Sequence, residues 1–189
     1  MVAAATILLT RRFSARIDDS KRLSRRQREV AFEELIGRSL WGIGVVSAEA
    51  IDASDISRCT RRAMELAVED LPVEPDALVV DGLEHLSLAI PQTAMVRGDQ
   101  RHRAIAAASI IAKVFRDRLM GMYDELFPGY EFHRHVGYGT VRHLERLACL
   151  GPSPIHRRTF APVSAALRGM GSVIHDAQSF GERGRAGSR

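Results

Sequence analysis

Short apolar runs alternate with longer amphipathic segments along this chain. Four short runs, rich in small and β-branched residues, predict strands at residues 2–9, 41–48, 77–81 and 94–97. Four longer segments repeat apolar residues at helical spacing and predict helices at residues 24–40, 51–71, 104–127 and 140–150. Because strands and helices alternate in sequence, the pattern predicts an α/β fold.

Local signals mark several ends of these elements. Ser24, with Gln27 three residues later, resembles a capping box at the start of a helix. Pro72 ends the second helical segment. After about residue 167 the chain is rich in glycine, serine and arginine and has few apolar residues. We therefore predict one domain over residues 1–167 and a disordered tail over residues 168–189.

Composition and charge narrow the class of protein. The chain of 189 residues is long enough to bury a core, and its formal net charge of +4 fits a polyanionic partner. No apolar run reaches the roughly 18 residues of a membrane span. Cys59 and Cys149 lack the spacing of a disulfide framework or a metal site, which indicates a reducing compartment. We expect a cytoplasmic location.

Two aspartates follow predicted strands closely. Asp81 ends an apolar strand and precedes Gly82, and Asp99 follows Gly98 just beyond the next strand. Strand ends meet at one edge of an open α/β sheet, where two carboxylates suit a hard divalent cation. The alternatives are a turn-forming Asp-Gly pair at Asp81 and a helix-capping role for Asp99. For Asp117, inside a helix, we favour a structural role.

Other segments could contact a nucleic acid. Gly137 and Gly139 hold Tyr138 on a tight backbone before a helix, where its ring could stack on a sugar or base, or pack as an ordinary turn tyrosine. Residues 156–160 are basic with one aromatic, and residues 19–21 offer a hydroxyl and an ammonium group. Both could touch phosphate, although solvated surface is the alternative.

Six segments together resemble the ribonuclease HII family. They occur in the order of the family and at compatible spacings. They are residues 19–24, 79–82, 98–99, 106–114 with 116–117, 137–140 and 156–163. The resemblance implies an RNase H-like fold, a mixed β-sheet flanked by helices, with a helical C-terminal region. It also implies an endonuclease that cuts the RNA strand of RNA–DNA hybrids, and incises at ribonucleotides embedded in duplex DNA, leaving 5′-phosphate ends.

The resemblance also assigns roles to residues. The family's site holds four carboxylates around Mg²⁺ or Mn²⁺, and Asp81 and Asp99 would be the third and fourth. Tyr138 would lie against the sugar whose 2′-hydroxyl separates RNA from DNA. The remaining predicted substrate-binding residues are Ser20, Lys21, Gly137, Gly139, Thr140, Arg157 and Arg158. The expected partners are RNA–DNA hybrids and duplexes containing ribonucleotides, with no membrane, and the expected state is a monomer.

The family's first motif is absent from this chain. In the family an Asp-Glu pair and a Gly-Arg-Gly segment precede the strand that here begins at Val2, on a strand central in the sheet. Two metal carboxylates are therefore missing, and a slot is expected in the core. Val136 and Arg97 also stand where lysine is common in the family.

Several explanations and functions are compatible with the missing motif. We hypothesise an N-terminally shortened gene product, and the in-frame genomic sequence upstream tests this. The functional alternatives are an inactive nucleic-acid-binding remnant and a structural fragment that needs a partner strand to fold.

Overall fold

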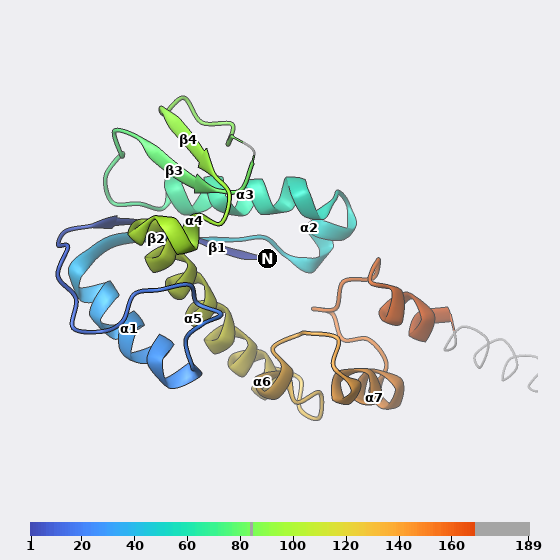
Figure 1. Ribbon diagram of the computed structural model, residues 1–189. Coiled ribbons are helices and arrows are strands. Elements are labelled where there is room, and N and C mark those ends of the chain that lie inside the picture. The colour runs from blue at the N-terminus through green and yellow to red at the C-terminus, as the bar shows by residue number, and fades with distance from the viewer. Residues whose placement is uncertain (84, 169–189) are drawn as a thin grey trace, which may run out of the picture. The chain divides into compact units, whose positions relative to one another are not determined.

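The computed structural model describes residues 1–83 and 85–168. The chain forms two compact units, Met1–Leu119 and Met120–Arg189, and each is described by itself. The first unit contains β1 (Val2–Leu8), α1 (Arg25–Arg38), β2 (Ser39–Val45), α2 (Ala48–Asp52), α3 (Ile56–Glu69), β3 (Leu78–Asp81), β4 (Gln92–Met95), α4 (Gly98–Arg101) and most of α5 (Arg103–Leu126) (Figure 1). The second contains the end of α5, α6 (Phe132–His135), α7 (Val141–Leu150) and helical residues 161–168.

The strands β1 and β2 form an antiparallel ladder between two helical layers. Their register runs from Val2 opposite Val45 to Leu8 opposite Ser39. On one face α3 packs very close to β2, because a Cβ added at Gly44 would lie 1.8 Å from the carbonyl oxygen of Ala63. Any side chain there would push the helix away from the strand.

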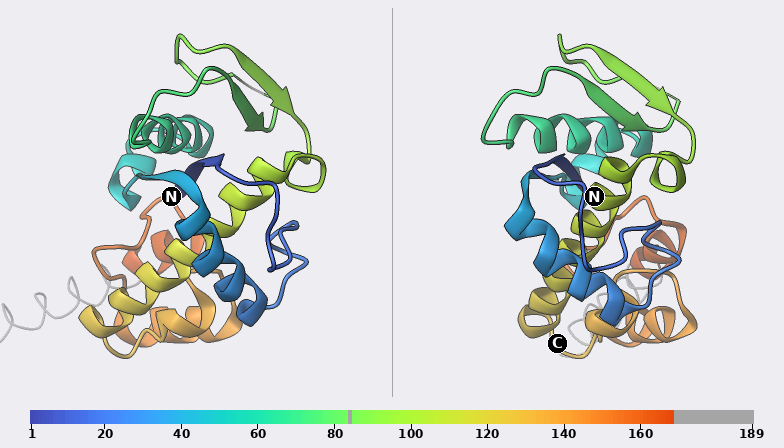
Figure 2. Two further views of the ribbon diagram at one scale, coloured as in Figure 1. Left: turned by 90° about the vertical axis from the view of Figure 1, so that its left-hand side faces the viewer. Right: turned by 60° about the vertical axis from the view of Figure 1, so that its left-hand side comes forward.

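The other face of this ladder carries α1 and α5 (Figure 2). Leu35 of α1 and Ile110 and Ile111 of α5 are fully buried in the core between these helices and β1. The small residues of α5 include Ala107, which is completely buried in the same cluster.

The strands β3 and β4 form a separate parallel ladder, with Leu78 opposite Gln92 and Asp81 opposite Met95. Among the described residues, β1 pairs only with β2 and β3 pairs only with β4. The sheet is thus interrupted between β1 and β3, as expected for a chain without the central strand. Neither ladder alone has the three strands that usually give a sheet independent stability.

Buried aromatic rings and histidines form the centre of the second unit. Tyr130 stacks on Phe132 with ring centroids 5.1 Å apart, and the ring of Phe132 also contacts those of His135, His143 and His156. The hydroxyl of Tyr130 donates to the carbonyl of Gly151 at 2.7 Å. This core holds α6 and α7 together.

Most predicted elements are confirmed, and three need correction. The predicted helix 51–71 is two helices, α2 and α3, because Asp55 begins a new one by accepting from the backbone N–H of Arg58 at 2.8 Å. The predicted strand 94–97 is β4 at Gln92–Met95, because Arg97 takes the left-handed conformation at φ 52°. The predicted strand 41–48 is β2, which begins earlier, at Ser39.

The remaining predictions concern the helix cap at Ser24, the shortest helices and the tail. The capping box of Ser24 and Gln27 is present at α1, with both reciprocal hydrogen bonds. The short helices α4 and α6 were not predicted, since four residues show no periodicity. Of the predicted tail, Arg168 ends the described part of a helical segment, and residues 169–189 lie outside the described residues.

Candidate metal and nucleic-acid site

Asp81 lies at the carboxyl end of β3, where Gly98 fixes one of its oxygens. The backbone N–H of Gly98 donates to Asp81 Oδ1 at 2.9 Å. A Cβ at Gly98 would lie 2.4 Å from Cδ1 of Ile105 and 3.4 Å from Asp81 Oδ1. Any other residue here would have to displace the end of the Ile105 side chain, so glycine favours this close approach of α4 to the strand end. The side chain of Asp81 itself remains exposed to solvent.

Asp99 follows at once, in the first turn of α4. Burial, reinforced by the nearby carboxylates of Asp19 and Asp81, raises the pKa of Asp99. Asp99 directly follows Gly98, the residue that binds Asp81, and so lies beside Asp81 at the sheet edge. Gln100, the next residue, binds a third carboxylate, from a loop far away in sequence.

That third carboxylate, Asp19, was not singled out from the sequence. It is 5% exposed, accepts from the backbone N–H of Lys21 at 2.9 Å and from Gln100 Nε2 at 3.2 Å. The hydrogen bond from Lys21, countered in part by burial, lowers the pKa of Asp19. In the sequence its segment stands out only for the serine hydroxyl and the lysine ammonium. The signal available was an acidic residue inside a motif shared with the family.

The neighbouring Ser20 is held inside the protein. Its hydroxyl lies 2.8 Å from that of Ser109 on α5 and its carbonyl accepts from Arg28 Nη1 at 2.9 Å. Ser20 is buried, and these two hydrogen bonds anchor its loop to α5 and α1. Lys21, the next residue, is exposed to solvent. A phosphate contact from this segment therefore stays a prediction, and Lys21 is better placed for it.

The carboxylates at this edge offer oxygen donors, which a hard cation such as Mg²⁺ or Mn²⁺ prefers. Asp81 is exposed, and Asp99 lies near the carboxylates of Asp19 and Asp81, whose charge a cation would neutralise. Within residues 1–83 and 85–168, however, no group of three or more His, Cys, Asp or Glu side chains is arranged to hold a metal ion. The donor set thus fits a cation whose remaining positions are filled by water or phosphate.

In the second unit, a strained loop presents Tyr138 to solvent. The tyrosine is 54% exposed, and its backbone N–H donates to the carbonyl of His135 at 2.8 Å. Gly137 and Val136 both have positive φ, at 79° and 44°. Thr140 caps α7, its hydroxyl accepting from the backbone N–H of His143 at 3.3 Å. The predicted glycine turn before a helix is present.

Two buried histidines stabilise this loop through consecutive hydrogen bonds. His143 Nδ1 lies 2.9 Å from the carbonyl oxygen of Tyr138, and its Nε2 lies 3.0 Å from Nε2 of His156. The backbone N–H of Ser153 donates to His156 Nδ1 at 3.0 Å. A neutral chain satisfies every partner: His156 Nε2 donates to His143, and His143 Nδ1 donates to the carbonyl. Burial lowers the pKa of both histidines, that of His156 to about 4.

The predicted basic residues lie in the same unit as the loop. The guanidinium of Arg157 is 5.6 Å from the ring centre of Phe160. A Cβ at Gly139 would lie 3.3 Å from Cζ of Phe160, so this ring packs directly on the glycine turn. Arg158 is exposed to solvent. The loop of Tyr138 and Arg157 are therefore linked through Phe160.

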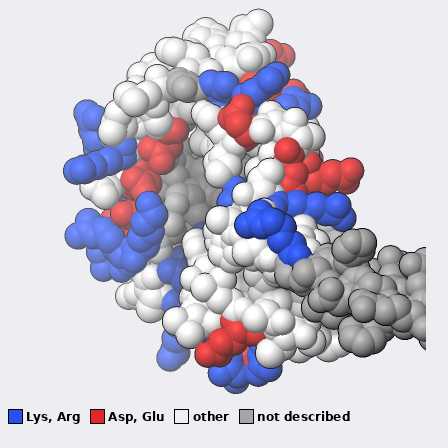
Figure 3. Space-filling view, turned by 90° about the vertical axis from the view of Figure 1, so that its right-hand side faces the viewer, with Lys and Arg blue, Asp and Glu red and all other residues white. Residues whose placement is uncertain are grey.

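Acidic and basic side chains are interspersed on the surface. On the face drawn in Figure 3, lysine and arginine side chains of the described residues lie beside acidic ones. Among the described residues some of these charges form ion pairs, for example Arg118 with Glu29 and Glu33 at 2.7 Å each.

Solved structures similar to this chain establish its fold. The ribonuclease H2 from Pyrococcus horikoshii matches with a TM-score of 0.64 at 19% identity, over 88% of this chain and 97% of that one. The structure of the PCNA:RNase HII complex from Archaeoglobus fulgidus contains a match with a TM-score of 0.65 at 24% identity, over 83% of this chain and 84% of that one. The fold is therefore RNase H-like, the α/β class predicted from the sequence.

Sequence relatives then identify the family. The profile of ribonuclease HII matches residues 1–163. Proteins called ribonuclease HII are 44% identical in Thermotoga petrophila, over 86% of this chain and 67% of that protein, and 47% identical in Chloroflexus aurantiacus, over 88% and 82%. The chain belongs to the ribonuclease HII family, a family of endoribonucleases. It spans about two thirds of the Thermotoga relative.

None of the described helices is long and apolar enough to cross a membrane.

Proposed function

We propose that this chain is a metal-dependent endonuclease that cleaves the RNA strand of RNA–DNA hybrids and incises at ribonucleotides within duplex DNA. The observation that supports it most is the hydrogen bond from Gly98 to Asp81, which brings Asp81 and Asp99 to one sheet edge. Burial, and after it the nearby carboxylates of Asp19 and Asp81, raise the pKa of Asp99, so negative charge gathers at this edge. A divalent cation would relieve this excess.

Asp81 and Asp99 would hold the cation, Mg²⁺ or Mn²⁺, at this edge. A bound cation of this kind supplies activated water and stabilises charge on a phosphate and its leaving oxygen. The side chain of Asp81 is exposed to solvent, and the hydrogen bond from Gly98 restrains its carboxylate. Asp19 stays paired with the Lys21 backbone and Gln100, and so orients the loop beside the cation.

Tyr138 and the basic residues would bind the substrate. The exposed ring of Tyr138, between Gly137 and Gly139, offers a flat surface for the sugar of the ribonucleotide. Lys21, Arg157 and Arg158 would contact phosphates, which position a duplex without reading its sequence. Thr140 keeps the loop in place as the cap of α7.

The test is an incision assay on a DNA duplex that contains one ribonucleotide, in the presence of Mn²⁺. We expect incision that leaves a 5′-phosphate end and falls at least about 100-fold in Asp81→Asn, which keeps the side-chain shape and removes the charge. Asp76→Asn, at an exposed loop position, is the matched control and should retain activity. Equal incision by the Asp81 and Asp76 variants would refute the assignment.

A second candidate is a nucleic-acid-binding protein without cleavage. The described residues contain no group of three or more side chains that could hold a metal ion, which favours this alternative. Binding of the same duplex, with no incision under Mn²⁺ or Mg²⁺, would support it. Weaker binding at higher salt would confirm that phosphates carry the contact. We further propose that the protein acts as a cytoplasmic monomer, and sedimentation tests the monomeric state.

A further inference from the structure

The loop between β1 and α1, together with the first turn of α1, carries a dense group of positive charges. Its exposed cations, here called the basic surface, are Arg11, Arg12, Arg16, Lys21, Arg22, Arg25 and Arg26. The same stretch contains two acidic residues, Asp18 and Asp19, and Asp19 is buried. Seven positive and two negative charges leave +5 over residues 11–26, which exceeds the +4 of the whole chain.

Four of these cations have no acidic partner. Asp18 pairs with Arg16, and its Oδ1 lies 3.7 Å from Nη1 of Arg22. The acidic side chains of α1 are engaged elsewhere, two of them by Arg118 and one by the backbone of the loop. Within residues 1–83 and 85–168 no ion pair forms at Arg11, Arg12, Arg25 or Arg26. Their charge is therefore available to an external anion.

The arginines in the first turn of α1 do not serve the helix itself. A helix N-terminus is partly positive, so Arg25 and Arg26 stand at its unfavourable end, and that turn contains no acidic residue. The capping box of Ser24 and Gln27 already satisfies the backbone there. An open hollow of about 320 Å³, lined by Arg16 and Arg26 among others, lies between the loop and this turn. Cations of the loop and of the helix thus border one space.

Inward-facing side chains of α1 hold the backbone of this loop (Figure 1). Arg28 Nη1 donates to the carbonyl of Leu23 at 2.6 Å. The carboxylate of Glu34 accepts from the backbone N–H groups of Ser14 and Ala15 at 2.9 and 2.7 Å. The basic surface is therefore formed before any partner binds, which lowers the entropy cost of binding.

Both ends of the loop reach the segment that follows Asp99. Near its start, the carbonyl of Arg11 accepts from Nη1 of Arg103 at 2.6 Å. Near its end, Asp19 accepts from Nε2 of Gln100 at 3.2 Å. The basic surface therefore adjoins the edge of the sheet that carries the candidate metal ligands.

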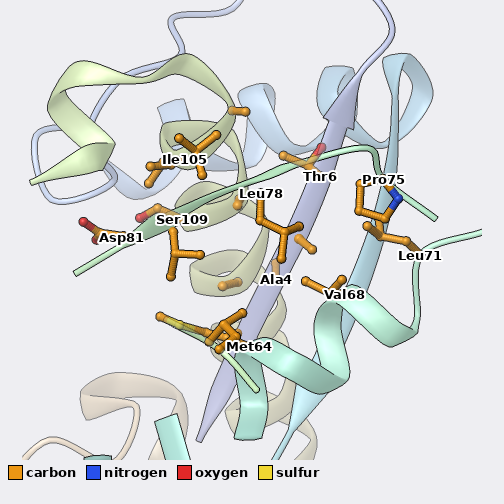
Figure 4. A pocket seen from close by; sticks show the side chains of 18 of the residues that line it. Ala4, Thr6, Met64, Val68, Leu71, Pro75, Leu78, Asp81, Ile105 and Ser109 are labelled. Atoms are coloured by element: carbon orange, nitrogen blue, oxygen red, sulfur yellow. The ribbon is translucent and has the colours of Figure 1, made fainter. Parts of the chain in front are cut away.

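A further contact joins the loop to α5 near the same edge. The hydroxyl of Ser20 lies 2.8 Å from that of Ser109. An apolar cavity of about 300 Å³ lies between β1 and β3, and Figure 4 shows Ser109 and Asp81 on its wall. The loop is thus fixed, through α5, relative to the strand end that carries Asp81.

We propose that the basic surface binds the phosphate backbone of a nucleic-acid duplex alongside the metal edge. This rests on the proposed function for the place of the duplex, and adds the surface that holds it. Guanidinium groups suit phosphate because their N–H donors pair with its oxygens. Phosphate contacts release counterions and do not read bases. The surface therefore supplies affinity for any duplex, whether or not it contains a ribonucleotide.

The test is fluorescence anisotropy of the full chain with a DNA duplex that contains one ribonucleotide, in EDTA and over a range of salt. Arg11→Gln with Arg12→Gln, and separately Arg25→Gln with Arg26→Gln, should each weaken binding at least about 5-fold at about 100 mM salt. Each pair should also reduce the slope of log K against log salt concentration by about 1–2. An all-DNA duplex of the same sequence should show equal losses.

Matched variants show whether position or net charge matters. Arg58→Gln with Arg62→Gln removes the same charge from exposed positions of α3 and should leave the slope unchanged. Arg25→Lys with Arg26→Lys keeps the charge and should keep the slope. If a glutamine pair fails to fold, guanidinium NMR signals of the unaltered protein decide. Those of the basic surface should shift when duplex is added, and that of Arg58 should not.

Unchanged slopes in both glutamine pairs, or an equal loss in the α3 pair, would overturn the proposal. Binding to phosphatidylserine vesicles as tight as to the duplex would overturn it as well, because the partner would then be a lipid surface. Binding is measured without metal, so the two proposals fail separately. Binding through this surface without incision under Mn²⁺ refutes the nuclease alone, whereas incision with unchanged slopes refutes the surface alone.

Discussion

The side chains that shape the second unit are neutral, buried histidines. His143 and His156 are 3% and 8% exposed, and they connect the backbone of Ser153 to the carbonyl of Tyr138 through consecutive hydrogen bonds. A histidine is useful here because its neutral ring has one donor and one acceptor. Protonation of either ring would place a second donor against a donor and break the chain.

This network predicts a loss of stability in acid. Burial lowers the pKa of His156 to about 4, below the unfolded value near 6.5, so the unfolded chain binds more protons between these pH values. The stabilisation is complete above about pH 6.5 and is lost as the pH falls to about 4, by up to about 3 kcal/mol. Urea unfolding from pH 7.5 to 4 measures it. His156→Gln should flatten this profile, whereas His85→Gln, at an exposed position, should not.

Val136 is the most strained residue near the loop. A β-branched residue at φ 44° is a conformational outlier, which asparagine adopts with much less cost. We predict that Val136→Asn raises the free energy of unfolding by about 1 kcal/mol, measured by urea denaturation. Val141→Asn, at an exposed position, should change it by less than about 0.5 kcal/mol. A destabilised Val136→Asn protein would contradict the strain argument.

At the scale of elements, Arg118 ties α5 to α1. Its Nη2 donates to Glu29 and Glu33 at 2.7 Å each, and its guanidinium lies 4.4 Å from the centre of the Phe32 ring. These two carboxylates raise the pKa of Arg118. Exposed ion pairs contribute little singly, but here two carboxylates and one ring share a single side chain.

We therefore predict that Arg118→Ala lowers the free energy of unfolding by about 1–2 kcal/mol. The measurement is chemical denaturation at low and high salt, and the difference should shrink in high salt because the ion pairs are screened. Arg26→Ala, at an exposed position of α1, should cost less than about 0.5 kcal/mol. A salt-independent loss would point to packing of the side chain on Phe32 alone.

At the scale of the whole molecule, the main feature is the interruption of the sheet between β1 and β3. Ala107 and Ala108 are neighbours on α5, but Ala107 is packed in the core under α1 whereas Ala108 faces the cavity. Replacement by leucine should therefore change the stability of the protein in opposite directions at the two positions. Ala107→Leu overpacks a filled core, while Ala108→Leu fills part of an empty one.

We predict that Ala108→Leu stabilises the protein by about 0.5–2 kcal/mol and that Ala107→Leu destabilises it by about 1–3 kcal/mol. Thermal unfolding of the two variants side by side measures the contrast. Destabilisation of similar size in both proteins would mean that the region around Ala108 is as densely packed as the core.

The sequence by itself determined the types of most elements and the place of Asp81 at the end of a strand. Apolar periodicity, caps and glycines are local signals, so they are readable without the fold. The break at Asp55 was missed because apolar spacing continues across it. Residue motifs shared with the family, and not the local pattern, favoured a metal role for Asp81 over a turn.

Only the tertiary structure decided which groups meet. Asp19 joins Asp81 and Asp99 although it lies far from them in sequence, and His143 and His156 meet through the packing of separate segments. The interruption between β1 and β3 is likewise a matter of pairing. A strand's own residues define its two edges, but whether each edge finds a partner depends on residues that are distant in sequence.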